Sequence, residues 1–151
     1  MSEREQVPPV MPFLSMWTRP DGLSGIGAAD LAGFELGSVG GKASPLWMRE
    51  IPGEVTKVLF NHMEVGWKGE WHESPVPQWI VPLSGRWFIE TQDGTRVEMG
   101  PGDIHWGQDL GTRQVDGNTG HRSGQVGDEP CVQLMVQFAQ PHNLGSFEPF
   151  D

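Results

Sequence analysis

The chain has 151 residues, enough for a single domain with its own hydrophobic core. Ten lysines and arginines stand against twenty aspartates and glutamates, and the net charge of −10 argues against binding to nucleic acid or to an anionic membrane surface. Twenty-one glycines and thirteen prolines interrupt any long helix and favour short strands joined by turns. The composition therefore predicts an all-β protein.

The first twenty residues lack the basic start and the apolar run of a secretory signal. No segment approaches the roughly 20 apolar residues of a membrane helix, so we expect a cytoplasmic chain without a membrane partner. Cys131 is the only cysteine, which excludes an internal disulfide. Its place in a strand-like run predicts a buried, unreactive thiol.

In chain order, residues 1–44 form a proline-rich start that we interpret as an arm and leader, with one short helical turn expected over residues 28–34. The β-barrel is expected over residues 45–140 and a tail over residues 141–151. The strands predicted within the barrel cover residues 55–60, 66–71, 78–83, 86–91, 95–99, 103–108 and 131–138.

Two turns or loops stand out between these strands. Asp93 and Gly94 separate residues 86–91 from residues 95–99 and give the strongest hairpin signal in the chain. Residues 110–120 form a polar, glycine-containing loop that leads directly to His121. Loops of this length are often functional, and the sequence leaves open whether this one is a lid.

The segment from Gly66 to Gly85 carries the most informative pattern, with His72, Ser74 and Gln78 between the two glycines. This pattern resembles the first motif of the cupin superfamily, in which two histidines and a glutamate stand between such glycines. Serine occupies the second histidine position here, and glutamine occupies the glutamate position. The resemblance implies an RmlC-like double-stranded β-helix, a jelly-roll barrel, and it covers roughly residues 45–139.

The second cupin motif places one more histidine after a glycine. Starting from Gly102 makes His121 that histidine, reached through a longer loop than usual. The alternative starts at Gly94 and ends at His105, but it leaves too few residues after Gly85 for the intervening strands, so we prefer His121. The closest resemblance is to a bacterial single-domain branch with a WHxxPxxQ first motif, to which no general function is assigned.

In metal-binding cupins, three histidines and a carboxylate converge on one divalent ion. The resemblance therefore implies His72, Gln78 and His121 as ligands of Fe, Mn, Ni or Zn, with Gln78 as a weak neutral donor. In the alternative interpretation, His72 and Gln78 form hydrogen bonds inside a polar pocket that binds no metal. The two interpretations have equal weight at this point.

Other side chains are candidates for ligand binding or catalysis. Ser74 shares a strand face with His72 and is expected, with Gln78, Trp71 and Trp106, to line a ligand pocket. His105 is the candidate catalytic acid–base residue if it faces inward, and a surface or interface residue if it faces outward. Most of the seven tryptophans are expected in the core, His62 is expected to be structural, and His142 to be exposed.

Phosphate-binding, HExxH, CxxC and GxSxG motifs do not occur in the sequence. We expect a small-molecule-binding protein that forms a homodimer. The first functional hypothesis is a metal-dependent enzyme, a dioxygenase, lyase or isomerase, acting in the barrel interior. The alternative is a metal-free binding or sensing module, or an acid–base isomerase that uses the same pocket.

Overall fold

The computed structural model of the protein describes residues 6–141, and every element in that range is a β-strand. The prediction of an all-β protein is confirmed. Within the described residues there is also no helix of the length and apolarity needed to cross a membrane.

The largest sheet has six strands in the order β2-β1-β9-β6-β11-β5. Its β1 and β9 run parallel, and its other neighbours are antiparallel. The bounds of these strands are β1 Met11–Thr18, β2 Ser24–Leu31, β5 Val55–Met63, β6 Gln78–Ser84, β9 His105–Gln108 and β11 Cys131–Phe138.

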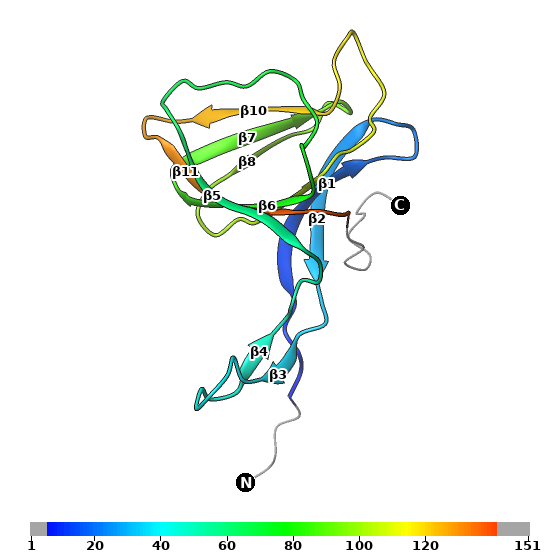
Figure 1. Ribbon diagram of the computed structural model, residues 1–151. Helices are drawn as coiled ribbons and strands as arrows, with labels where there is room; N and C mark the ends of the chain where they lie inside the picture. Colours follow the sequence, from blue (N-terminus) through cyan, green and yellow to red (C-terminus); the bar gives the residue numbers. More distant parts are fainter. Residues whose placement is uncertain (1–5, 142–151) are drawn as a thin grey trace.

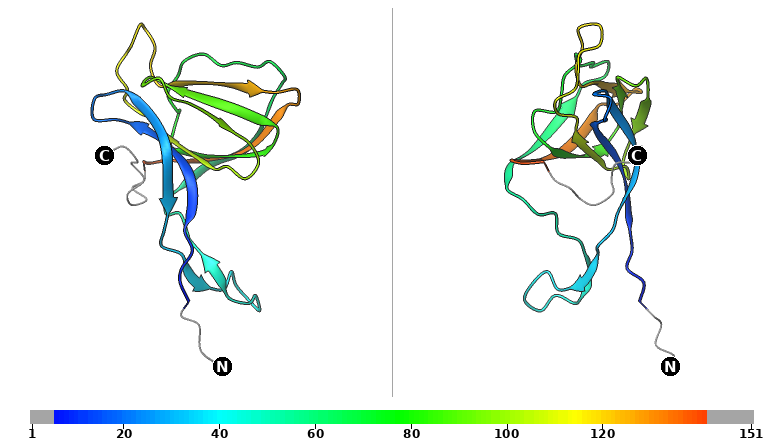
Figure 2. Two further views of the ribbon diagram at one scale, coloured as in Figure 1. Left: turned by 180° about the vertical axis from the view of Figure 1, so that it is seen from behind. Right: turned by 90° about the vertical axis from the view of Figure 1, so that its right-hand side faces the viewer.

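A second sheet of three strands has the order β10-β7-β8 and lies across from the β6 part of the larger sheet (Figure 1). Its strands are β7 (Arg86–Thr91), β8 (Arg96–Met99) and β10 (His121–Val126). Strands β3 (Glu35–Gly37) and β4 (Leu46–Met48) form a separate hairpin that projects away from both sheets (Figure 2). The described strands thus enclose an interior between two sheets, but they do not form one closed barrel.

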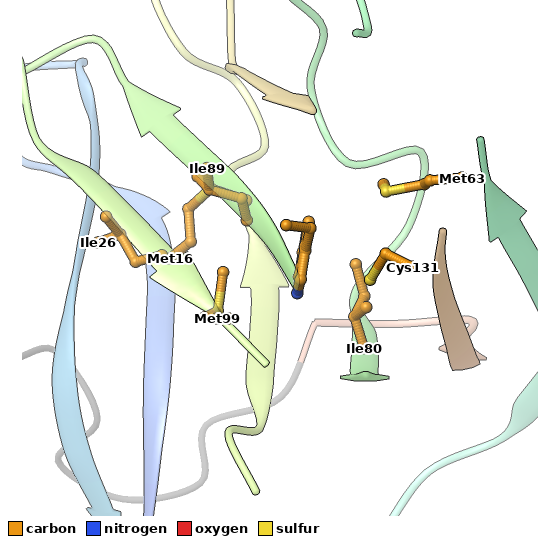
Figure 3. Close-up of a cluster of buried hydrophobic side chains, with 8 residues drawn as sticks. Met16, Ile26, Met63, Ile80, Ile89, Met99 and Cys131 are labelled. Carbon is orange, nitrogen blue, oxygen red and sulfur yellow. The ribbon is translucent and has the colours of Figure 1, made fainter. Parts of the chain in front are cut away.

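Apolar side chains from both sheets fill much of this interior (Figure 3). Alternation along each strand sends every second residue inward. The members of this first cluster are Met16, Ile26, Met63, Ile80, Trp87, Ile89, Met99 and Cys131. Cys131 is buried as predicted, and burial raises the pKa of its thiol.

A second buried cluster lies on the other side of the six-stranded sheet. It consists of Phe13, Leu31, Trp79, Trp106 and Phe138. Trp79 and Trp106 are opposite each other in the β6–β9 pairing, and their ring centroids are 4.8 Å apart. Four of the seven tryptophans are buried, as expected for core residues: Trp17, Trp79, Trp87 and Trp106.

The N-terminal region differs from the sequence-based expectation. The helical turn predicted over residues 28–34 is wrong, because Ala28 and Ala29 lie in β2, paired with Leu14 and Phe13 of β1. Strands β1 and β2 also belong to the six-stranded sheet, so this sheet begins at Met11 and not near residue 45. Alanine favours a helix locally, but pairing with an apolar neighbouring strand decides the conformation.

The other strand predictions fare better. The segments over residues 86–91 and 131–138 are confirmed with those bounds, and the Asp93-Gly94 turn joins β7 to β8. The strand predicted over residues 66–71 is wrong. That segment makes only an isolated bridge between Lys68 and Gly124, because Gly66, with φ of 88°, turns the chain away from extended structure.

Candidate functional site

His72 and His121 lie side by side, as the sequence analysis expects of residues that share one site. The backbone amide of each donates a hydrogen bond to the carbonyl of the other, at 2.8 and 2.9 Å. Their ring centroids are 4.7 Å apart. His121 opens β10 and is buried, whereas His72 is exposed to solvent. The pair therefore lies at the boundary between the solvent and the protein interior.

A buried carboxyl group orients His121. Asp109 follows directly after β9, and its Oδ2 atom lies 2.6 Å from His121 Nδ1. Its Oδ1 atom accepts a hydrogen bond of 2.9 Å from the Ser74 backbone amide. Asp109 is fully buried and His121 is 5 % exposed, so this hydrogen bond to a carboxylate is shielded from water and is strong.

The Nδ1 atom of each of three histidines lies within hydrogen-bond distance of an oxygen acceptor. His72 Nδ1 is 2.8 Å from the Glu70 carbonyl, and His105 Nδ1 is 3.2 Å from the Leu14 carbonyl, while His121 contacts Asp109. Since a carbonyl or carboxylate only accepts, Nδ1 carries the proton in each ring. The neutral form of each ring therefore presents the Nε2 lone pair to whatever approaches it.

His105 faces the interior and is fully buried, which resolves the alternative left open by the sequence. Its ring stands edge-on to Trp87, with ring centroids 5.6 Å apart. Burial is the main cause that lowers the pKa of His105 to about 3, and nearby His121 lowers it further. Asp109 and the Leu14 carbonyl offset part of this effect. His105 is consequently neutral at physiological pH.

The loop over residues 110–120 is fixed at its base next to the site. Glu73 Oε1 accepts hydrogen bonds from the amide and the hydroxyl of Thr112, at 2.8 and 2.9 Å. The Thr112 hydroxyl in turn accepts a hydrogen bond of 2.7 Å from the Gly120 amide. Since Asp109 and His121 flank this loop, the same contacts that close its base also position the Asp109–His121 pair.

Gly120 is the residue on which the close approach of His72 and His121 depends. Its φ is 69°, and a β-carbon at this position would lie only 2.1 Å from the His72 carbonyl oxygen. We expect Gly120→Ala to destabilise the fold by about 1–3 kcal/mol from backbone conformation alone and to separate the two histidines. Hydrogen exchange should show loss of protection at the His72 and His121 amides. Wild-type protection in the variant would contradict this assignment.

The structure places the other predicted site residues as follows. Gln78 is buried, and its Oε1 atom accepts a hydrogen bond of 2.9 Å from Gln137 Nε2. Ser74 is buried near His105. Trp71 lines a small hollow of about 130 Å³ with residues of the 110–120 loop, next to Arg122. Trp106 lies in the second cluster, on the side of β9 opposite His105.

Sequence reasoning missed Asp109. The available signal was an acidic residue directly after a strand that carries a histidine, a place from which a carboxyl group can turn inward. His62, expected to be structural, is half exposed on β5 with its Nδ1 atom 3.4 Å from Glu64 Oε1. His142 lies outside the described residues.

The side chains fit a metal ion poorly. Among residues 6–141, no group of three or more histidine, cysteine, aspartate or glutamate side chains is arranged to hold one. Gln78 already accepts the Gln137 amide, and Asp109 is engaged by His121 and Ser74. Of the three ligands predicted from the sequence, only His72 and His121 remain, whereas catalytic metal sites use three protein ligands. The three ligands predicted from the sequence therefore do not form a complete metal site among residues 6–141.

The fold and the site together define an all-β protein in which two buried histidines, His105 and His121, lie near a buried carboxylate, with the exposed His72 beside His121. A scan against models of known protein families finds no match for this chain, and no curated protein matches it in sequence.

Proposed function

We propose that this protein is a small-molecule-binding cupin that acts as a metal-independent acid–base isomerase. The observation that carries the proposal is the buried contact of 2.6 Å between Asp109 and His121, with His72 beside it. A histidine held by a buried carboxylate is the arrangement that proton-transfer enzymes use, because the carboxylate fixes the tautomer and stabilises the imidazolium.

In this proposal His121 Nε2 removes a proton from the bound molecule, and Asp109 stabilises the resulting positive charge. The imidazolium of His121 then returns this proton to a second position of the molecule and becomes neutral again. His72, whose own Nδ1 is held by the Glu70 carbonyl, accepts a hydrogen bond from the ligand through its Nε2 atom. The 4.7 Å between the rings lets both imidazoles reach one small ligand. Ser74 is linked to the pair through its backbone amide and Asp109.

The test follows deuterium into the ligand. A molecule that co-purifies with the protein is identified by mass spectrometry and incubated in D₂O with catalytic amounts of protein. We expect wild-type protein to exchange a carbon-bound hydrogen, and His121→Gln to slow this exchange by about 100-fold or more. His62→Gln changes a half-exposed histidine and is the matched control. Absence of exchange with wild-type protein would refute the proposal.

One observation favours a second candidate, the metal-dependent enzyme. Histidines that bind metals commonly donate their other ring N–H to an oxygen, as His72 and His121 do here. Elemental analysis of protein purified without chelator separates the two candidates. Near-stoichiometric transition metal that disappears in His72→Ala and His121→Ala would favour the metal enzyme. Its absence after metal repletion, with ligand binding intact, would favour acid–base chemistry.

We further propose that the protein forms a homodimer through β5. This strand is an edge of the six-stranded sheet, and its Val58 and Phe60 are 60 % and 69 % exposed. An apolar edge strand can pair with the same strand of a second copy about a two-fold axis. Sedimentation equilibrium is expected to give a dimer for wild-type protein and a monomer for Phe60→Lys. A wild-type monomer at millimolar concentration would exclude this interface.

A further inference from the structure

Two buried polar atoms come close to the backbone of Gly107 on the interior side of β9. A β-carbon at position 107 would lie 2.9 Å from Ser74 Oγ, 3.2 Å from His105 Nε2 and 3.5 Å from Met16 Cε. Because glycine has no side chain, the hydroxyl and the imidazole both reach this point. Any larger residue at position 107 would be forced against both atoms.

Neither polar atom has a hydrogen-bond partner within the described part of the chain. Ser74 is 2 % exposed and His105 is fully buried, so both groups have given up their hydrogen bonds to bulk water. A buried polar group without a partner costs about 1–3 kcal/mol. Two such groups that flank one point in the interior of the protein indicate a place where a third polar group belongs.

The chemistry of the two atoms restricts that third group. His105 Nδ1 carries the proton toward the Leu14 carbonyl, so His105 Nε2 can only accept a hydrogen bond. The Ser74 hydroxyl can both donate and accept. A carboxylate has no proton to donate to Nε2 at neutral pH, so a carboxylate oxygen would place its lone pairs against the lone pair of Nε2. An alcohol hydroxyl satisfies both atoms, because it donates to Nε2 and accepts from Ser74.

We propose that Ser74, His105 and Gly107 form a subsite for an alcohol hydroxyl, so that the ligand of this protein is a neutral, hydroxylated small molecule. The inference deepens the proposed function and depends on it for the presence of a ligand near His121. Ser74 connects the two places, because its backbone amide donates to Asp109, the partner of His121.

The Trp87 indole supports a polar ligand at this place. Its ring lies beside the His105 ring, and its Nε1 atom is buried without a hydrogen-bond partner among residues 6–141. An indole N–H only donates, so it can serve a second oxygen of a polyhydroxylated molecule. The net charge of −10 likewise disfavours an anionic ligand.

The experiment titrates ¹⁵N-histidine-labelled full-length protein at pH 7 with glycerol, D-ribose and D-glucose, and separately with acetate. We expect a saturable upfield shift of the His105 Nε2 resonance with at least one hydroxylated probe and no shift with acetate. Ser74→Ala should raise the Kd of that probe by tenfold or more. Gly107→Ala should abolish the response, because its β-carbon occupies the subsite.

Ser15→Ala is the matched control, because Ser15 is also fully buried and its hydroxyl also has no partner in the described structure. Ser15 is paired with Trp106 in the register of β1 and β9, and so it lies away from the subsite. Its response should equal that of wild-type protein. A shift with acetate alone, or none with all three hydroxylated probes, overturns the subsite. The shift reports binding and needs no turnover, so failure of the proposed proton transfer remains distinguishable from failure of the subsite.

Discussion

Replacing Asp109 by alanine is expected to destabilise the protein by about 3–5 kcal/mol. The carboxyl group of Asp109 is fully buried and accepts hydrogen bonds from His121 Nδ1 and from the Ser74 amide. Alanine would leave both donors buried without an acceptor. It would also release the base of the 110–120 loop, which is bracketed by Asp109 and His121. Urea unfolding at pH 7 measures the loss.

Two variants test the cause of this effect. Asp128→Ala removes an exposed carboxylate from the β10–β11 connection and should change the free energy of unfolding by less than about 0.5 kcal/mol. Asp109→Asn keeps the volume and an acceptor oxygen for one of the two donors, so its loss should lie between those of the other two variants. If Asp109→Ala unfolds like Asp128→Ala, the buried contact with His121 contributes nothing to the fold.

Local sequence signals predicted the strands with clear alternation or clear turns. Cys131–Phe138 places Val136 and Phe138 on one face and Cys131 and Met135 on the other, and the two faces pack in different clusters. Asp93-Gly94 marks a turn that needs a positive φ, which Gly94 supplies with 88°. These features depend on neighbours in sequence, so the sequence alone was sufficient for them.

Features that depend on distant pairing were not predictable in the same way. Strand β2 contains a run of alanine and glycine, and only its partner β1 makes it a strand. The pairing of His72 with His121 was expected from the resemblance to cupins. The role of Asp109, by contrast, depends on a turn of the chain after β9 that no periodicity signals.

Some residues were assigned to one site because they are neighbours in the chain, and the structure separates them. Trp71 precedes His72 but lies beside Arg122, and Trp106 follows His105 but packs on Trp79. Adjacent residues of a strand point to opposite faces, so a pocket on one face is lined by alternate residues of the strand. Applied strictly, this rule favours Ser74 and His105 over both tryptophans as pocket residues. The proposed hydroxyl subsite contains Ser74 and His105 and neither tryptophan.

The stability of the protein should fall steeply as the pH drops from 6.5 to 3, and His105 should cause much of that fall. In the unfolded chain its pKa has the ordinary value of 6.5, whereas in the folded protein burial lowers it to about 3. Below pH 6.5, His105 therefore binds a proton in the unfolded chain but remains neutral in the folded protein. The linked loss is on the order of 5 kcal/mol by pH 3, and none of it appears above pH 6.5.

His105→Phe keeps a ring in the same place and removes the titrating group. Urea unfolding of this variant and of wild-type protein is compared at intervals from pH 7 to pH 4. The wild-type free energy should decline more steeply, by more than about 2 kcal/mol across this range, whatever the offset at pH 7. His121 and Asp109, which interact with His105, are present in both proteins. Parallel curves would mean that His105 takes up its proton inside the folded protein, and a charged imidazolium there could not accept the hydroxyl proposed for its Nε2.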